Sequence, residues 1–201
     1  GAIQWPDVQR SWVWDEDNIR SLLASVLNGY PVGALLTLET GGQVQFQPRV
    51  LEGVERERLA LHQGPVPKPD LLLLDGQQRS TSLYQTLLST QPVLCNDRRG
   101  KPQERFLYLD IGKALAGESI TEICVVVVPA SRLIYDAIYR KTLVDVSTPE
   151  NEYESHLVPL NQVFNFFNWL GGWQAHWKQH AAPQDVPVQE LLALIGRVNQ
   201  Y

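Results

Sequence analysis

The segment LLLLDGQQRSTSLY, residues 71–84, places a cluster of polar side chains directly after an apolar run. This pattern predicts a strand that ends in a tight turn and opens a helix. The first backbone N–H groups of a helix have no acceptor within it, and the helix dipole favours an anion there. Gly76 would let a phosphate approach the backbone, and Arg79 offers a planar fork that matches phosphate oxygens. The segment therefore predicts a phosphate-binding site.

Hydroxyl groups follow in the same segment. Thr81 and Ser82 could donate to a phosphate or ligate a metal ion. The segment is not a Walker A loop, because the Gly-Lys-Ser/Thr ending is absent. A plainer interpretation stays open: Asp75 and Gln78 have capping-box spacing, so Asp75 could cap the helix and leave Arg79 on a solvated face.

A second candidate segment lies near the start of the chain, in the aromatic-rich residues 3–14. Gln9 and Arg10 could hydrogen-bond to phosphates or to base edges. Trp12 and Trp14 are two residues apart, so in an extended segment they would share a face and could stack on a base. The alternative is that these tryptophans, together with Trp5, are buried anchors of the core.

The elements that position these segments mix helix and strand up to about residue 130. Apolar spacing predicts one helix between Asp17 and Gly29 and another over 77–89. Strands are expected at 71–74, 106–111 and 123–128, with a β-hairpin over 34–47 and a helical turn at 113–116. The remaining stretches are expected to be irregular: a loop over 48–69 and a basic turn over 96–105.

After Pro129 the spacing becomes helical, and helices are predicted over 131–143, 161–180 and 187–200. The fold class is therefore α/β (α+β), with an α/β domain at residues 1–130 and a helical subdomain at 131–201. In the second of these helices, Trp169, Trp173 and Trp177 recur every four residues and are expected to pack in the core or against the α/β part.

Composition and charge narrow the class of protein. The 201 residues are 44% hydrophobic, and no apolar run reaches membrane-spanning length. Two cysteines are too few for a disulfide framework, so a cytoplasmic location is expected.

His176 and His180 have the spacing of a helical metal pair, but no third ligand is evident, so no protein metal site is predicted. The net charge of −5 argues against a strongly basic nucleic-acid binder but allows a local basic surface of Arg49, Arg98, Arg99, Lys101 and Arg105.

Three motifs together resemble the N-terminal domain of GmrSD-type restriction endonucleases, a family that includes sensors of phosphorothioate-modified DNA in bacterial defence. They are Ile3-x-x-Pro6-x-x-Gln9-Arg10-x-x-Val13-Trp14, Asn28-Gly29-Tyr30-Pro31-Val32-Gly33 and Asp75-Gly76-Gln77-Gln78-Arg79-x-Thr81-Ser82-Leu83-Tyr84. The resemblance is specific over residues 3–84 and looser beyond them. Any one motif would be weak, but the order and spacing of all three argue against a chance match.

The resemblance implies a ParB/sulfiredoxin-like fold that binds and hydrolyses a nucleoside triphosphate, often GTP, with Mg²⁺. It implies that Asp75, Gln78 and Arg79 are catalytic. The residues expected to hold the nucleotide are Gly76, Gln77, Thr81, Ser82 and Arg10. In the phosphorothioate sensors the segment that matches Pro6–Trp14 looks like part of the modification-reading pocket, and the matching DNA-binding residues are Pro6, Val8, Gln9, Arg10, Trp12 and Trp14.

A mechanism follows from these roles as a hypothesis. Arg79, helped by Arg10, would neutralise the charge that develops during phosphoryl transfer. Asp75 would hold Mg²⁺ or orient the attacking water, and Gln77 or Gln78 could also position that water.

The resemblance also implies a partner, because in this family a separate HNH nuclease domain usually cuts the DNA. The sequence contains no Cys-x-x-Cys pair and no His–Asn–His run, so cleavage by this chain is not expected. The expected function is a GTP-hydrolysing sensor of modified DNA in a restriction or antiphage system, controlling an HNH nuclease on the same or a partner chain. Two alternatives stay open: a modified-DNA binding module without hydrolysis, and an interaction domain that only controls a nuclease.

Overall fold

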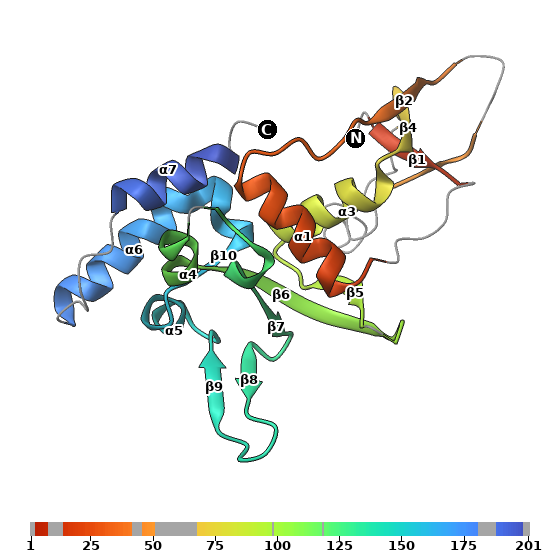
Figure 1. Cartoon of the computed structure of the whole chain (residues 1–201). Coiled ribbons are helices and arrows are strands. Elements are labelled where there is room, and N and C mark those ends of the chain that lie inside the picture. Colours follow the sequence, from red (N-terminus) through yellow and green to blue (C-terminus); the bar gives the residue numbers. More distant parts are fainter. Residues whose placement is uncertain are drawn as a thin grey trace.

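The computed structural model describes residues 3–7, 14–41, 46–50, 68–97, 99–117, 119–180 and 188–198. Within these ranges the strands form two four-stranded sheets and a separate two-stranded pair, with helices packed around them (Figure 1). This arrangement confirms the predicted mixed α/β fold class. Among the described residues, none of the helices has the length and apolar character that crossing a bilayer requires.

The first sheet has the strand order β2, β4, β1, β3. Its strands are β2 (Leu36–Glu39), β4 (Leu71–Asp75), β1 (Ile3–Pro6) and β3 (Pro48–Arg49). β1 runs parallel to β4, whereas β2 is antiparallel to β4 and β3 is antiparallel to β1. The apolar β4 thus lies between two strands, and its Leu72 and Leu73 are buried.

The described residues do not show the pairing of the predicted hairpin over residues 34–47. Its first arm, β2, pairs with β4 instead, more than thirty residues further along the chain. β3 begins just after the predicted second arm and pairs with β1, while residues 42–45 lie outside the described ranges. The physical reason is that β4, an apolar strand, buries more surface with a neighbour on each side than a local hairpin would.

The second sheet is organised around β6 (Pro102–Asp110), which pairs antiparallel with three strands. These are β5 (Val93–Asn96), β7 (Val125–Pro129) and β10 (Leu157–Pro159). β5 has no counterpart among the predicted strands, and β6 begins four residues before the predicted strand at 106. The first part of β6 is largely exposed and polar, so it carries no apolar alternation that would mark a strand.

Residues 131–143, predicted to be a helix, instead form part of a β-hairpin. β8 (Leu133–Tyr135) and β9 (Thr142–Asp145) pair antiparallel. Between them, Asp136 Oδ1 accepts hydrogen bonds from the backbone N–H groups of Ile138 and Tyr139, at 2.8 and 2.6 Å. This local turn, flanked by residues that favour strands, prevails over the helical spacing of the apolar residues.

The helices pack against the second sheet and against one another. They are α1 (Glu16–Leu27), α3 (Gln77–Leu87), α4 (Ile111–Ala116), α5 (Pro149–Glu154), α6 (Phe166–Gln179) and α7 (Val188–Val198), with 3-10 helices η1 (Glu122–Cys124) and η2 (Leu160–Asn165). Asp15 is the N-cap of α1, and its Oδ1 accepts a hydrogen bond from the backbone N–H of Asn18 at 2.8 Å. The helices predicted near 17–28, 77–89, 161–180 and 187–200 are confirmed in type, with small shifts in their bounds.

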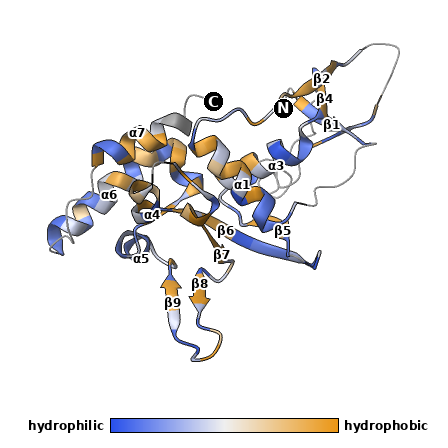
Figure 2. Cartoon of the chain, viewed as in Figure 1, coloured by the Kyte–Doolittle hydropathy of each residue, from blue (hydrophilic) through white to orange (hydrophobic). Residues whose placement is uncertain are grey.

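The main core draws on residues from both halves of the chain. Leu109 of β6, Val125 of β7 and Leu191 of α7 are fully buried in one cluster with the apolar face of α1. Figure 2 shows hydrophobic residues gathered where α1, α4, α7 and β7 meet. The boundary proposed near residue 130 therefore runs through a shared core. The predicted packing of Trp169 and Trp173 is confirmed, since both are buried in the same cluster.

A cluster of polar side chains fastens the β8–β9 hairpin to β6. Arg132 Nη1 donates to Tyr108 Oη at 2.7 Å and to Glu152 Oε1 at 3.5 Å. The Arg132 guanidinium carbon also lies 4.0 Å from the centre of the Phe106 ring. Glu152 is buried, and this burial raises the pKa of its carboxyl from 4.5 to about 7. The base of the hairpin is thus held by part-buried contacts of Arg132 with Tyr108 and the buried Glu152 carboxyl.

The glycine pair in α6 generates the first prediction. At Gly172 a Cβ would lie 2.2 Å from Tyr153 Oη, whereas at Gly171 nothing lies within 4 Å of an added Cβ. Gly172→Ala should therefore lower the melting temperature through overpacking, which costs roughly 1–3 kcal/mol. The matched Gly171→Ala should raise stability by up to about 1 kcal/mol, because alanine favours a helix. Thermal melts followed by circular dichroism test this, and equal effects at both positions would contradict it.

The second prediction concerns pH. The carboxyl of Glu152 has a higher pKa when folded than when unfolded, so its contribution to stability is fully present below about pH 4.5 and is lost as pH rises through about 7. Relative to Glu152→Gln, the wild type should therefore lose about 1–3 kcal/mol between these limits. Melting temperatures of both proteins across this range test the difference. His156 also has a lowered pKa, but it is present in the wild type and in Glu152→Gln, so its effect cancels in the difference between their melting temperatures. A constant difference across the range would refute the prediction.

Candidate functional site

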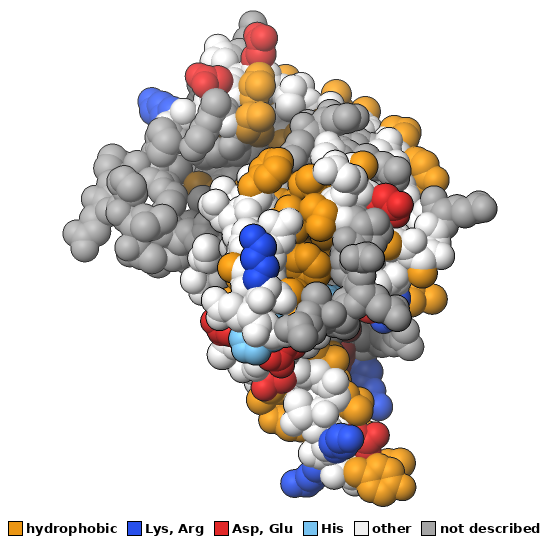
Figure 3. Space-filling model, turned by 90° about the vertical axis from the view of Figure 1, so that its left-hand side faces the viewer, with side chains coloured by type: hydrophobic (Ala, Val, Ile, Leu, Met, Phe, Trp, Pro, Cys, Tyr) orange, Lys and Arg blue, Asp and Glu red, His pale blue; other side chains and the backbone are white. Residues whose placement is uncertain are grey.

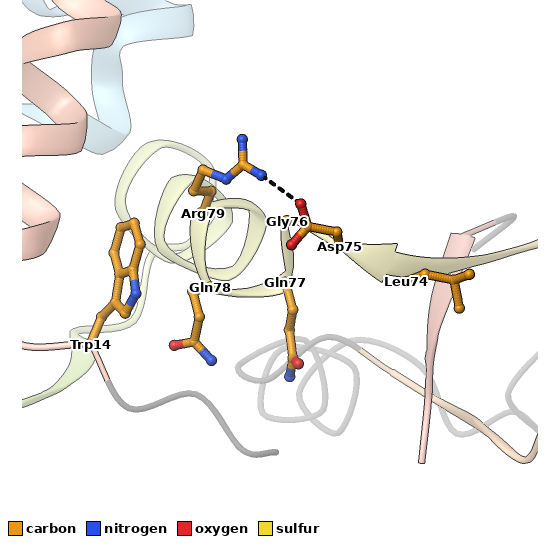
Figure 4. Close-up of a pocket in the computed structure, with 7 residues that line it drawn as sticks. All are labelled: Trp14, Leu74, Asp75, Gly76, Gln77, Gln78 and Arg79. Atoms are coloured by element: carbon orange, nitrogen blue, oxygen red, sulfur yellow. Dashed lines mark hydrogen bonds and ion pairs between the residues drawn. The ribbon is translucent and has the colours of Figure 1, made fainter. Parts of the chain in front are cut away.

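A cleft of 460 Å³ lies at the start of α3 (Figure 4). The described residues that line it are Trp14, Leu74, Asp75, Gly76, Gln77, Gln78 and Arg79. The cleft therefore contains all five residues of the Asp75–Arg79 motif, together with the last residue of the N-terminal motif. Its volume lies within the range typical of small-molecule sites. By contrast, a cavity beside Tyr108 and Arg132 has only 20 Å³, room for about one water.

The turn at the bottom of the cleft requires glycine. Gly76 has φ = +96°, and a Cβ there would lie 2.4 Å from Leu35 Cδ2. Gly76 is also the N-cap residue of α3, and the helix has no side-chain cap hydrogen bond. The first bond that closes the helix runs from Ser80 N–H to the Gly76 carbonyl at 2.9 Å. The helix start therefore faces the cleft without a capping side chain.

The alternative in which Asp75 caps this helix is wrong. Asp75 is the last residue of β4, and its Oδ2 lies 3.3 Å from Arg79 Nη2. Arg79 is also not on a solvated face, since its side chain is only 21% exposed. The reason is that the positive φ of Gly76 makes glycine the N-cap and directs the preceding carboxylate toward the arginine one turn later.

Arg79 joins the second and third motifs. Its Nη1 donates to the carbonyl of Val32, and its Nη2 donates to the carbonyl of Ala34 at 2.9 Å. Gly33 lies between these carbonyls with φ = +92°, and a Cβ there would come within 2.2 Å of Arg79 Nη1. These contacts of Arg79 were not predictable from its place in the sequence. The only signal was the glycine that ends the Asn28–Gly33 motif.

Gln77 and Gln78 lie on the other side of the helix start from Asp75 and Arg79 (Figure 4). Gln77 is 7% exposed, and its Nε2 has no hydrogen-bond partner among the residues that the structure describes. An unsatisfied buried donor costs about 1–3 kcal/mol. The predicted catalytic residues are thus brought to one cleft, but Gln78 is separated from the Asp75–Arg79 pair.

Thr81 and Ser82 are buried and do not line the cleft. Ser82 Oγ donates to the carbonyl of Gln78 at 2.8 Å, within the helix. Their role as phosphate or metal ligands stays a prediction, and it would need these hydroxyls to turn outward from the helix.

The N-terminal segment reaches the cleft through Trp14. This side chain is half-buried, packs against the main core, and its carbonyl accepts a hydrogen bond from Asn96 N–H at 3.1 Å. Trp5 is buried, which confirms the core interpretation for that residue, and Pro6 is buried at the end of β1. The other predicted DNA-binding residues, Val8, Gln9, Arg10 and Trp12, lie outside the described residues.

The predicted basic surface is not continuous in the described part of the chain. Arg105 Nε lies 2.5 Å from Glu16 Oε1, and Arg99 shares a hollow with several carboxylates, including those of Asp15, Asp17 and Asp97. Arg49 belongs to the other sheet, in β3, and Arg98 lies outside the described residues. The described residues also contain no group of three or more His, Cys, Asp or Glu side chains that could hold a metal ion.

Comparison with known proteins identifies the family. The family model of the GmrSD restriction endonuclease N-terminal domain matches residues 1–168, so the chain belongs to this family, as the three motifs predicted. The uncharacterized protein MJ0686 of Methanocaldococcus jannaschii is 32% identical over 111 residues, which cover 55% of this chain and 18% of that protein. The chain thus spans less than a fifth of that curated relative. No solved structure matches the chain at a significant level.

The contact between Gly33 and Arg79 generates the third prediction. Gly33→Ala and Gly41→Ala both place a Cβ on a backbone with φ above +90°, so both incur strain of about 1–2 kcal/mol. Only at Gly33 would the Cβ also displace the Arg79 guanidinium from its carbonyls, because nothing lies within 4 Å of a Cβ at Gly41. Gly33→Ala should therefore be the less stable by roughly 1–3 kcal/mol in urea denaturation. Equal losses would show that the Arg79 contacts contribute nothing to stability.

Proposed function

We propose that this member of the GmrSD N-terminal-domain family hydrolyses a nucleoside triphosphate, with GTP as the expected substrate, and couples hydrolysis to the recognition of modified DNA. Phosphorothioate DNA is the first candidate ligand. Membership of the family supports a role in restriction. In this proposal the domain controls DNA cleavage by a separate HNH nuclease domain on the same or a partner chain.

The convergence of the three motifs on the cleft at the start of α3 supports this proposal most directly. Trp14 comes from the first motif and Gly76 to Arg79 from the third, and Arg79 is tied to the second through the carbonyls of Val32 and Ala34. The first and third motifs, far apart in sequence, line one cleft of 460 Å³, and the second motif is connected to it through Arg79. A shared cleft gives nucleotide and DNA recognition a physical connection.

The residues at the helix start fit a phosphate group. The helix has no side-chain cap, so a phosphate oxygen would accept from its first backbone N–H groups. Gln77 Nε2, a buried donor without a partner among the described residues, would find its acceptor in the same ligand. The cost of this unpaired donor would then be recovered on binding.

Mg²⁺ would arrive with the triphosphate. The carboxylate of Asp75 is 71% exposed at the rim of the cleft and could supply one ligand. The remaining ligands would be phosphate oxygens and water, which is usual for Mg²⁺ on a nucleotide. The metal would neutralise phosphate charge, while the helix start and Gln77 would orient the phosphate chain.

A second candidate function is modified-DNA binding without hydrolysis. It is favoured by one observation: the Arg79 guanidinium already donates to two carbonyls and contacts Asp75. In the hydrolysing function, Arg79 would use its remaining N–H groups, or would exchange a carbonyl for a phosphate oxygen in the transition state. In the second, Arg79 only holds the cleft together.

The fourth prediction separates ligand binding from folding through Gln77. Gln77→Leu should fold at least as stably as the wild type, because it removes an unsatisfied buried amide, yet it should weaken nucleotide binding about tenfold or more. The matched control is Gln85→Leu on the same helix. Gln85 Oε1 accepts from Leu94 N–H at 2.9 Å, so its loss should destabilise the protein. Thermal melts and calorimetric titration with GTP and Mg²⁺ measure both properties.

Phosphate release then tests hydrolysis in the same set of proteins. GTP, ATP, CTP and UTP are supplied with Mg²⁺, with and without phosphorothioate or base-modified duplex DNA. Turnover should rise with modified DNA, and Arg79→Ala should reduce it by about 100-fold or more if the guanidinium meets the transferring phosphate. Arg99→Ala, outside the cleft, is the control. Absence of turnover with every nucleotide, despite modified-DNA binding, would favour the second candidate.

A further inference from the structure

The β8–β9 hairpin, residues 133–145, projects from the body of the molecule (Figure 1). It takes no part in the cleft at the start of α3. Its base is fixed by the contacts of Arg132 with Tyr108 and Glu152, and by a hydrogen bond from Val146 N–H to the Arg132 carbonyl at 3.0 Å. Val146 itself is fully buried. The hairpin is therefore a firmly anchored projection.

The turn at its end, residues 136–141, is also built in one conformation. Asp136 N–H donates to the Lys141 carbonyl at 2.8 Å, and Arg140 N–H donates to the Asp136 carbonyl at 3.1 Å. The Asp136 carboxylate accepts from two further backbone N–H groups, and these bonds hold its pKa below the ordinary value. A turn ordered in this way loses little conformational freedom when it binds a partner.

The side chains at this turn combine two kinds of chemistry. Ile138 and Tyr139 are each 80% exposed, which is costly for large apolar groups in water. Arg140 and Lys141 follow them directly and are exposed. Figure 3 shows hydrophobic and basic side chains side by side at the lower end of the molecule. The turn carries two cations and one carboxylate, whereas the whole chain has a net charge of −5.

We infer that the turn of the β8–β9 hairpin contacts double-stranded DNA, with Arg140 and Lys141 on phosphates and Ile138 and Tyr139 against the sugars and base edges of a groove. β-ribbons enter the major or the minor groove of DNA, and proteins that bind the minor groove insert apolar side chains between base steps. The two adjacent, exposed cations Arg140 and Lys141 at the end of the turn favour a polyanion over a neutral protein surface. This inference rests on the DNA-recognition half of the proposed function.

The hairpin should supply affinity that does not depend on the DNA modification. Contacts to phosphates position a protein on a duplex without reading its sequence. We therefore expect hairpin variants to lose the same factor of affinity on modified and unmodified duplexes. Discrimination between the two duplexes would be left to the cleft and the N-terminal segment.

Fluorescence anisotropy with a labelled duplex, plain or phosphorothioate-modified, tests the inference on the whole chain. Arg140→Glu combined with Lys141→Glu should weaken binding at least about tenfold and make the dependence of log K on log salt shallower by about two. Ile138→Ala combined with Tyr139→Ala should weaken binding roughly tenfold at every salt concentration without changing that slope. Phe167→Ala with Lys178→Glu, on α6, is the control, because Phe167 is a comparably exposed apolar residue and Lys178 is exposed.

The outcomes separate the hairpin from the rest of the proposal. If the wild type binds duplex DNA and the hairpin variants bind equally well, the inference is overturned and the proposed function stands. A change in oligomeric mass with unchanged DNA binding would instead identify the turn as a contact between protein copies, and would also overturn it. If GTP is not hydrolysed but DNA binding depends on the hairpin, the hydrolytic proposal fails and the inference stands. Absence of DNA binding by the wild type would overturn both.

Discussion

The guanidinium of Arg79 is the interaction on which the cleft depends. It joins the carbonyls of Val32 and Ala34 to the helix start, and it holds the carboxylate of Asp75 at the end of β4. Because an arginine offers several donors in one plane, a single side chain can fix a loop, a strand end and a helix in one geometry. Gly33 is part of the same arrangement, since any Cβ there would occupy the position of the guanidinium.

The cleft also keeps a buried side-chain donor, Gln77 Nε2, that has no partner among the described residues. The start of α3 likewise has no side-chain cap. A chain selected only for stability would replace such groups, because they cost free energy in the empty protein. Their position beside Asp75 and Arg79 is explained if a ligand supplies the acceptors. Stability and binding would then make opposite demands on the same few residues.

The C-terminal part of the chain packs into the same fold and fixes the direction of the β8–β9 hairpin. α7 shares its core with α1, and β10 completes the sheet around β6, so this part is packed with the fold that carries the cleft. The part-buried contacts among Arg132, Tyr108 and Glu152 direct a projecting hairpin away from that core. Such contacts add little net stability, but they favour one arrangement, because the buried Glu152 carboxyl is costly to leave without a partner. The hairpin is consequently fixed in direction while its end stays exposed.

The sequence by itself determined the features that depend on neighbouring residues. The apolar spacing of α1, the strand–turn–helix at residues 71–84 and the family were all readable, because short-range periodicity and three ordered motifs carry them. The tertiary structure decided what depends on distant partners: β2 pairs with β4, residues 131–143 contain strands, and Arg79 binds backbone carbonyls 45 and 47 residues away. Helical spacing at 131–143 and a solvated face for Arg79 were reasonable local interpretations. They fail because strand pairing and burial of a charged group are settled by contacts that no short stretch of sequence contains.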